Sequence, residues 1–130
     1  MMARRQKTHR LGDLQLKILK VLWEKGEATV GVVSENLDGA GDLAYTTIAT
    51  MLRKMESRGL VSHRSEGRSY IYRAKVASKD VSRSMTDHLV ERLFEGSLVD
   101  AVNHLLTARE VSPDELAALE KLIVEKKRAL

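Results

Sequence analysis

The spacing of apolar residues predicts helices over most of the 130-residue chain. The segment 44–60 has the clearest division into two faces. At about 100° per residue, its apolar side chains fall on one face: Ile48, Met51, Leu52 and Met55. The opposite face carries hydroxyl groups and positive charge: Thr46, Thr50, Arg53 and Ser57. This division predicts a helix with one face in a core and the other exposed, either to solvent or to a partner.

Two shorter helices are predicted before this segment. The first begins at Gly12 and Asp13, ends at Gly26, and has a broad apolar face: Leu14, Ile18, Leu19, Val21, Leu22 and Trp23. The second covers 30–37, is capped by Thr29, and turns three residues inward: Val32, Val33 and Leu37. The turn DGAGD joins it to 44–60. Helices in this order, with a glycine-containing turn before the last, are typical of a helix-turn-helix.

After Gly59 the period changes from helical to alternating, which predicts a two-stranded hairpin with strands at 60–64 and 69–73. Tyr70 and Tyr72 are expected to pack inward. Arg64 and Arg68 are expected near the tip, where a wing would touch the phosphates beside a groove. A hairpin that only closes the core, with solvated arginines, is the alternative.

Three further helices are predicted to start near Ser78, Ser97 and Ser112. The last has the strongest start signal, a serine cap followed by Pro113 and by Glu115 at the third helical position. The apolar stripes of these helices are too narrow to enclose a core, so we expect an intertwined two-fold dimer, with packing back on the first domain as the alternative. The predicted dimerisation residues are Met85, Leu89, Leu98, Val102, Leu105, Leu116, Leu119 and Ile123.

The pattern as a whole predicts a mainly α protein with a small β-hairpin, in three parts. Residues 1–10 form a basic N-terminal arm, residues 11–76 a winged-helix DNA-binding domain, and residues 77–130 a three-helix dimerisation domain.

Composition narrows the function. The net charge is +4, and basic residues are concentrated in the first 75 positions, which suits nucleic acid. No apolar run approaches the roughly 18 to 20 residues that span a bilayer, and no signal-peptide core follows the N-terminus, so we expect a cytoplasmic protein without a membrane partner. The chain has no cysteine, which excludes disulfides, thiolate metal sites and thiol catalysis.

The order of side chains along 44–60 matches a helix that lies in the major groove, where N-terminal residues meet base edges and cations meet phosphates. The predicted DNA-binding residues are Thr46, Thr47, Thr50, Arg53, Lys54, Arg64 and Arg68. A protein-interaction adaptor would favour aromatic anchors on this face, and a ligand-responsive regulator would need a roomy pocket. The face from Thr46 to Ser57 is poor in such anchors, and the aromatic content of 4%, with the narrow apolar stripes of the C-terminal helices, argues against a roomy pocket.

Metal, nucleotide and catalytic sites are not expected. His88 and Glu91 share a helix face and His104 lies on the next helix, but such scattered ligands are more typical of solvated histidines. Gly39, Gly41 and Ala44 match a dinucleotide-binding pattern without the strand that must precede it. Because the chain also has no nucleophile elbow and no phosphate loop, we expect neither an enzyme nor a cofactor.

Five segments together resemble the penicillinase-repressor family of bacterial transcription regulators, also called BlaI/MecI/CopY. They are LGDLQLKILKVLWEKGEATV from Leu11, LAYTTIATMLRKMESRGLV from Leu43, EGRSYIYRA from Glu66, FEGSLVDAV from Phe94 and SPDELAALEKLI from Ser112. The resemblance implies a dimeric winged-helix repressor that binds a palindromic operator and controls β-lactam resistance or stress genes. It places base reading on Thr46, Thr47 and Thr50, with Ala49 and Arg53 beside them. The family often has a basic residue in place of Ala49, so a different operator preference is expected.

The resemblance also bears on how repression ends. The copper-responsive branch of the family uses C-terminal cysteines, which this chain lacks. The β-lactam branch is cut within its dimerisation helices after a membrane sensor detects the drug, which implies a sensor-linked protease as a partner. The corresponding region here is Asn103, His104 and Leu105, where the residue pair differs from the usual Asn-Phe.

Overall fold

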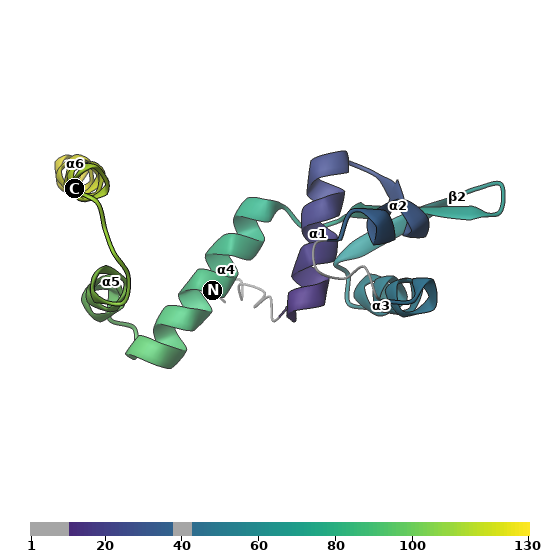
Figure 1. Ribbon diagram of the computed structural model, residues 1–130, viewed down its shortest axis with the longest axis horizontal. Helices are drawn as coiled ribbons and strands as arrows, with labels where there is room; N and C mark the ends of the chain where they lie inside the picture. Colours follow the sequence, from purple (N-terminus) through teal and green to yellow (C-terminus); the bar gives the residue numbers. More distant parts are fainter. Residues whose placement is uncertain (1–10, 38–42) are drawn as a thin grey trace, which may run out of the picture. The chain divides into compact units, whose positions relative to one another are not determined.

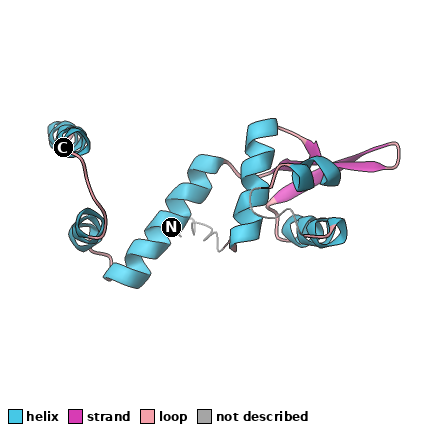
Figure 2. Ribbon diagram, in the orientation of Figure 1, coloured by secondary structure: helices cyan, strands magenta, loops and turns pink. Residues whose placement is uncertain are grey.

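A computed structural model of the chain describes residues 11–37 and 43–130 (Figure 1). The predicted basic arm and the glycines of the dinucleotide-like pattern lie outside the described residues. Within them, helices dominate and three short strands form one sheet, which confirms the predicted fold class (Figure 2). The elements are α1 (Asp13–Lys25), β1 (Ala28–Thr29), α2 (Val30–Glu35), α3 (Tyr45–Ser57), β2 (Val61–Glu66), β3 (Ser69–Ala74), α4 (Ser78–Phe94), α5 (Leu98–Thr107) and α6 (Pro113–Arg128).

The chain divides into two compact units, Met1–Asp87 and His88–Leu130. The division falls within α4, whereas the predicted domain boundary lay between residues 76 and 77, just before this helix.

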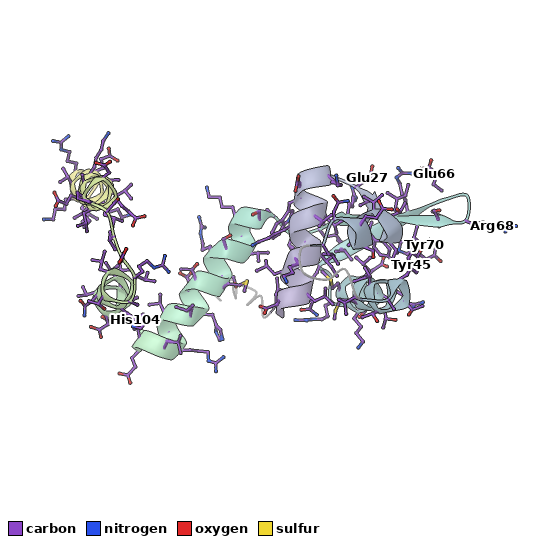
Figure 3. All side chains as sticks on the ribbon, viewed as in Figure 1. Glu27, Tyr45, Glu66, Arg68, Tyr70 and His104 are labelled. Atoms are coloured by element: carbon purple, nitrogen blue, oxygen red, sulfur yellow. The ribbon has the colours of Figure 1, made fainter. Side chains whose placement is uncertain are left out.

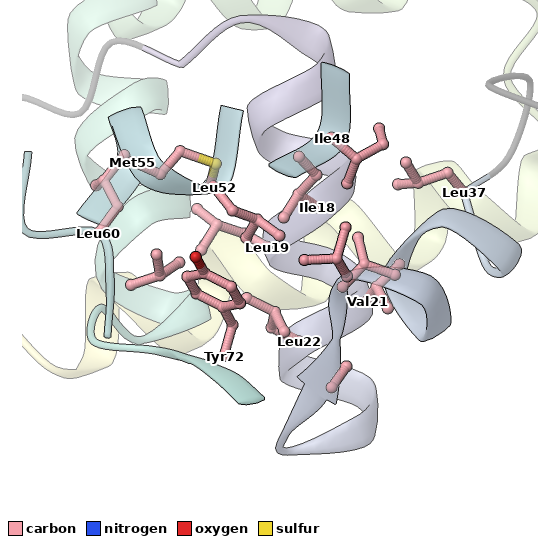
Figure 4. Close-up of a cluster of buried hydrophobic side chains, with 14 residues drawn as sticks. Ile18, Leu19, Val21, Leu22, Leu37, Ile48, Leu52, Met55, Leu60 and Tyr72 are labelled. Atoms are coloured by element: carbon pink, nitrogen blue, oxygen red, sulfur yellow. The ribbon is translucent and has the colours of Figure 1, made fainter. Parts of the chain in front are cut away.

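A single hydrophobic core holds the first unit together (Figure 4). The predicted inner face of α3 is confirmed, because Ile48, Leu52 and Met55 are fully buried and Met51 is half-buried. From the other elements the core takes Ile18, Leu19, Val21, Leu22, Ala28, Val30, Val33, Leu37, Leu60, Val61 and Tyr72. Burial of this apolar surface is the main stabilising contribution to the unit.

Of the apolar residues predicted inside on the first two helices, Leu14, Trp23 and Val32 are only half-buried. In α2, Val30 and Val33 share the inner face because they are three residues apart, and Val32 is turned to the edge of the core. Trp23 lies at the edge of the core because its indole N–H donates to the carbonyl oxygen of Val76 at 2.8 Å. This hydrogen bond ties the chain after the hairpin to α1.

Three helices, α2, α5 and α6, begin at the predicted caps. The hydroxyls of Thr29, Ser97 and Ser112 each accept a hydrogen bond from a backbone amide three residues ahead, at 3.2, 3.1 and 3.1 Å. Gly26 ends α1 at φ 81°, in the left-handed region that favours glycine.

The sheet is antiparallel, in the order β1-β3-β2. The hairpin is confirmed, but its turn is tighter than predicted because pairing continues to Glu66 and Ser69. Only Gly67 and Arg68 remain in the turn, and Gly67 has φ 60°, the arrangement of a type II′ connection. Arg68 is therefore at the tip. Arg64, expected there too, instead pairs with Ile71 well inside the ladder.

The second unit leaves most of its apolar side chains uncovered. Within residues 88–130, all of which the structure describes, Ala101 is the one buried residue. Large apolar side chains are exposed on each helical segment: Leu89, Leu93, Leu98, Val99, Val102, Leu105, Leu106, Leu116, Leu122, Ile123 and Val124. Of the described helices, none combines the length and hydropathy needed to cross a membrane.

Candidate nucleic-acid interface

The outer face of α3 is available to a partner because the core fixes the rotation of the helix. With Ile48, Leu52 and Met55 buried, the predicted contact residues on α3 all point away from the core and are exposed: Thr46, Thr47, Thr50, Arg53 and Lys54. Four of them, together with Met51, line a shallow hollow of about 260 Å³. The structure thus brings the three threonines and Lys54 around one surface.

Arg53 belongs to a second groove, between α3 and the hairpin. This groove has a volume of about 460 Å³, and its lining includes Tyr45, Ala49, Arg53, Arg68, Tyr70 and Tyr72. Arg53 and Arg68 come from different elements yet line the same groove. The Arg53 guanidinium also donates to the Thr50 hydroxyl at 3.4 Å, which connects the two surfaces. The groove therefore presents two positive charges to an anionic partner.

Two tyrosines of this groove were not predicted as contact residues. Tyr45 is 59% exposed at the first helical position of α3, and Tyr70 is 49% exposed on β3 (Figure 3). The expectation that Tyr70 packs inward is wrong, because its partner in the ladder is Ser65, beyond the part of the sheet that the core covers. The position of Tyr45 directly before the threonines could have indicated a contact residue. Its exposure, however, depends on how α3 packs and is not visible in the sequence.

Tyr72, by contrast, is buried as predicted. It is 2% exposed. Burial, and next the nearby Glu56 carboxylate, raises the pKa of Tyr72 above its ordinary value. Its hydroxyl stays protonated at neutral pH and cannot add negative charge to the groove.

Arg64 is separated from the other predicted contact residues. Its Nε lies 3.0 Å from Oε2 of Glu27, and its Nη1 lies 2.8 Å from Oε2 of Glu66. Hydrogen bonds to these carboxylates, with their charge, raise the pKa of Arg64. Because neighbours along a strand point to opposite faces, Arg64 lies on the face of the hairpin opposite His63. Figure 3 shows Glu27 and Glu66 on the other side of the hairpin from Tyr45 and Tyr70.

The predicted dimerisation residues lie on α4, α5 and α6, where Met85 and Leu119 are half-buried. The others are exposed: Leu89, Leu98, Val102, Leu105, Leu116 and Ile123. The predicted cleavage region lies in the middle of α5 and is exposed, with the His104 ring 5.6 Å from that of Phe94. Among the residues that the structure describes, no three His, Asp or Glu side chains gather as a metal site would require.

Comparison with known proteins decides the family. Residues 11–125 match the model of the penicillinase repressor family. The chain belongs to this family. Its function is accordingly that of a transcriptional repressor and not of an enzyme.

Relatives of known name cover nearly the whole chain. It is 35% identical over 122 residues to the transcriptional regulator BlaI of Mycobacterium tuberculosis, with 92% of this chain and 86% of that protein covered. It is 25% identical to the penicillinase repressor of Bacillus licheniformis, with 94% and 95% covered. Among solved structures, a mutant of MarR from E. coli has a TM-score of 0.50 at 17% identity, covering 88% of this chain and 76% of that one. This last likeness shows the fold alone.

Proposed function

We propose that this repressor acts as a homodimer that binds palindromic operator DNA, with α3 as its reading helix and the β2–β3 hairpin as its wing. The observation that carries the proposal is the exposed threonine and cation face of α3 beside a groove that Arg68 lines from the wing. An α-helix fits the major groove, and the two surfaces supply both base contacts and phosphate contacts.

The chemistry of the reading helix supports separate roles for its residues. Thr46, Thr47 and Thr50 offer hydroxyls that donate or accept, and methyl groups that can pack on a thymine methyl. Arg53 and Lys54 follow along α3 and supply positive charge for phosphates, and Arg68 adds a cation from the wing. Arg64 takes a secondary role in this proposal, because a phosphate contact would have to replace Glu27 and Glu66.

The exposed apolar side chains of the second unit support the homodimer. Monomeric proteins rarely leave many large apolar residues uncovered over three consecutive helical segments. A second copy presents the same apolar residues, so a two-fold interface covers both at once. A two-fold protein matches a palindromic operator, since each reading helix then meets an equivalent half-site.

We propose that the repressor controls β-lactam resistance or stress genes. We further propose that repression ends when a sensor-linked protease cleaves α5 near Asn103, His104 and Leu105. The carbonyl oxygen of Asn103 accepts from the Thr107 hydroxyl at 2.9 Å, and that of His104 accepts from the Ala108 amide at 2.9 Å. A protease must open these bonds, so α5 resists cutting until it unfolds locally.

Intact-mass measurement of the repressor from β-lactam-treated cells should detect fragments ending in this region. An intact chain in cells whose target genes are induced would contradict cleavage.

Fluorescence anisotropy against the chain's own upstream region and a scrambled duplex tests operator binding. We expect a preference of about a thousandfold for the operator. Thr47→Ala should reduce that preference about tenfold, because it removes a base contact worth about one kcal/mol or more. Ser57→Ala is the matched control, since its hydroxyl already donates to the Lys54 carbonyl at 2.9 Å. Equal weak binding of both duplexes by the unmodified protein would refute specific recognition.

The two wing arginines provide a paired test. Arg68→Ala should lower affinity for every duplex and reduce the slope of log K against log salt by about 1.8, because the dimer loses one phosphate contact in each half-site. Arg64→Ala removes the same charge from the same hairpin, but we expect a smaller change because Arg64 is already held by two carboxylates. Equal changes in slope would mean that Arg64 leaves those carboxylates to bind DNA.

Replacing Ile123 with Asp tests the dimer. Ile123 is exposed in the single chain, so the substitution leaves the fold of one copy intact but places a charge in the proposed interface. Sedimentation should show a monomer, with operator affinity reduced at least about tenfold. Lys121→Asp lies about 200° around α6 and should keep the dimer. A dimer that survives Ile123→Asp would exclude this face of α6 from the interface.

A further inference from the structure

A side-chain contact joins the reading helix directly to the wing. Nδ1 of His63, on β2, lies 2.7 and 2.8 Å from the two carboxylate oxygens of Glu56, on α3. Both groups are partly shielded, with 28% of the His63 side chain and 31% of the Glu56 side chain exposed. A hydrogen bond to a carboxylate in such a site is stronger than one between neutral groups.

The contact continues from His63 into the second strand of the wing. The His63 ring stacks on Tyr70 of β3, with centroids 4.2 Å apart and planes inclined by 25°. It also lies 5.5 Å from the ring of Tyr72. Tyr70 is two residues from Arg68. A series of contacts therefore runs from Glu56 on α3 through His63 to Tyr70, close to the cation at the wing tip.

The outer part of the wing has no hydrophobic core beneath it. On β2, Val61 is buried, whereas the residues beyond His63, from Arg64 to Glu66, are exposed. A two-stranded hairpin without a packed face is at best marginally stable in water. On its other face, Arg64 pairs with Glu27, which precedes β1 and is not part of the reading helix. The position of the wing tip relative to α3 therefore depends on polar and stacking contacts.

We propose that Glu56 and His63 are positioning residues that hold the wing at a set distance from the reading helix, so that Arg68 and α3 meet DNA together. This inference rests on the proposed DNA-binding function. Neither residue needs to touch DNA. They order the hairpin before DNA binds. Binding of Arg68 to its phosphate then does not carry the entropy cost of ordering a mobile hairpin.

The test asks whether the contribution of Arg68 to operator binding depends on Glu56. In the unmodified protein, Arg68→Ala should weaken operator binding about tenfold, but only about twofold in a Glu56→Ala background, because the wing is then no longer held in place. Arg53→Ala, on the reading helix itself, should weaken binding by the same factor in both backgrounds. Glu56→Gln keeps an acceptor for His63 and should restore most of the dependence on Arg68.

Two results would overturn the proposal. If Arg68→Ala weakens binding equally in both backgrounds, the wing is positioned without Glu56. If Arg53→Ala also loses its effect in the Glu56→Ala background, the substitution disturbs the whole domain and the role is not one of positioning.

A measurement without DNA separates this inference from the proposed function. Glu56→Ala should speed amide hydrogen exchange in the wing, residues 62–73, at least about threefold relative to the unmodified protein. Glu24→Ala, which removes the same charge from α1, should not change it. If the unmodified protein shows no operator preference, the proposed function fails and exchange alone decides whether the link exists. Unchanged exchange in Glu56→Ala would refute the link.

Discussion

Burial of the apolar face of α3 is the constraint on which the rest of the structure depends. Ile48, Leu52 and Met55 have no exposed surface, and together they set the rotation of the helix about its axis. Once that rotation is set, the threonines and Lys54 have no alternative but to face outward. The surface we propose for base reading is thus a consequence of core packing. A substitution in the core would rotate or loosen this surface even though every contact residue stayed the same.

Strand register acts as a second constraint, on charge. Side chains alternate between the two faces of the hairpin, so His63 and Tyr70 lie on the face toward α3 while Arg64 faces Glu27. The two-residue turn then leaves Arg68 at the tip. A shift of register by one residue would exchange the two faces and turn Arg64 toward α3. Strand pairing, as much as composition, therefore decides which arginines contribute positive charge to the groove.

The second unit is organised differently, since its helices bury almost nothing within one chain. Its caps are well formed, and Ser97 and Ser112 both accept amide hydrogen bonds, but caps specify where helices begin and not what covers them. In the function proposed above, the missing cover is the second copy. Cutting α5 would then remove the interface and the paired reading helices together, which couples release directly to assembly.

The sequence by itself determined the helices, their caps, the inner face of α3 and the existence of the hairpin, because these depend on periodicity and on residues three or four positions apart. It also determined that the threonines are exposed, because they lie away from the apolar face of α3. Only tertiary structure decided that β1 joins β3, that Tyr45 and Tyr70 line a groove, that Arg64 is paired, and that Glu56 meets His63. Each of these is a contact between separate elements, and no local pattern encodes which elements will meet or in what register.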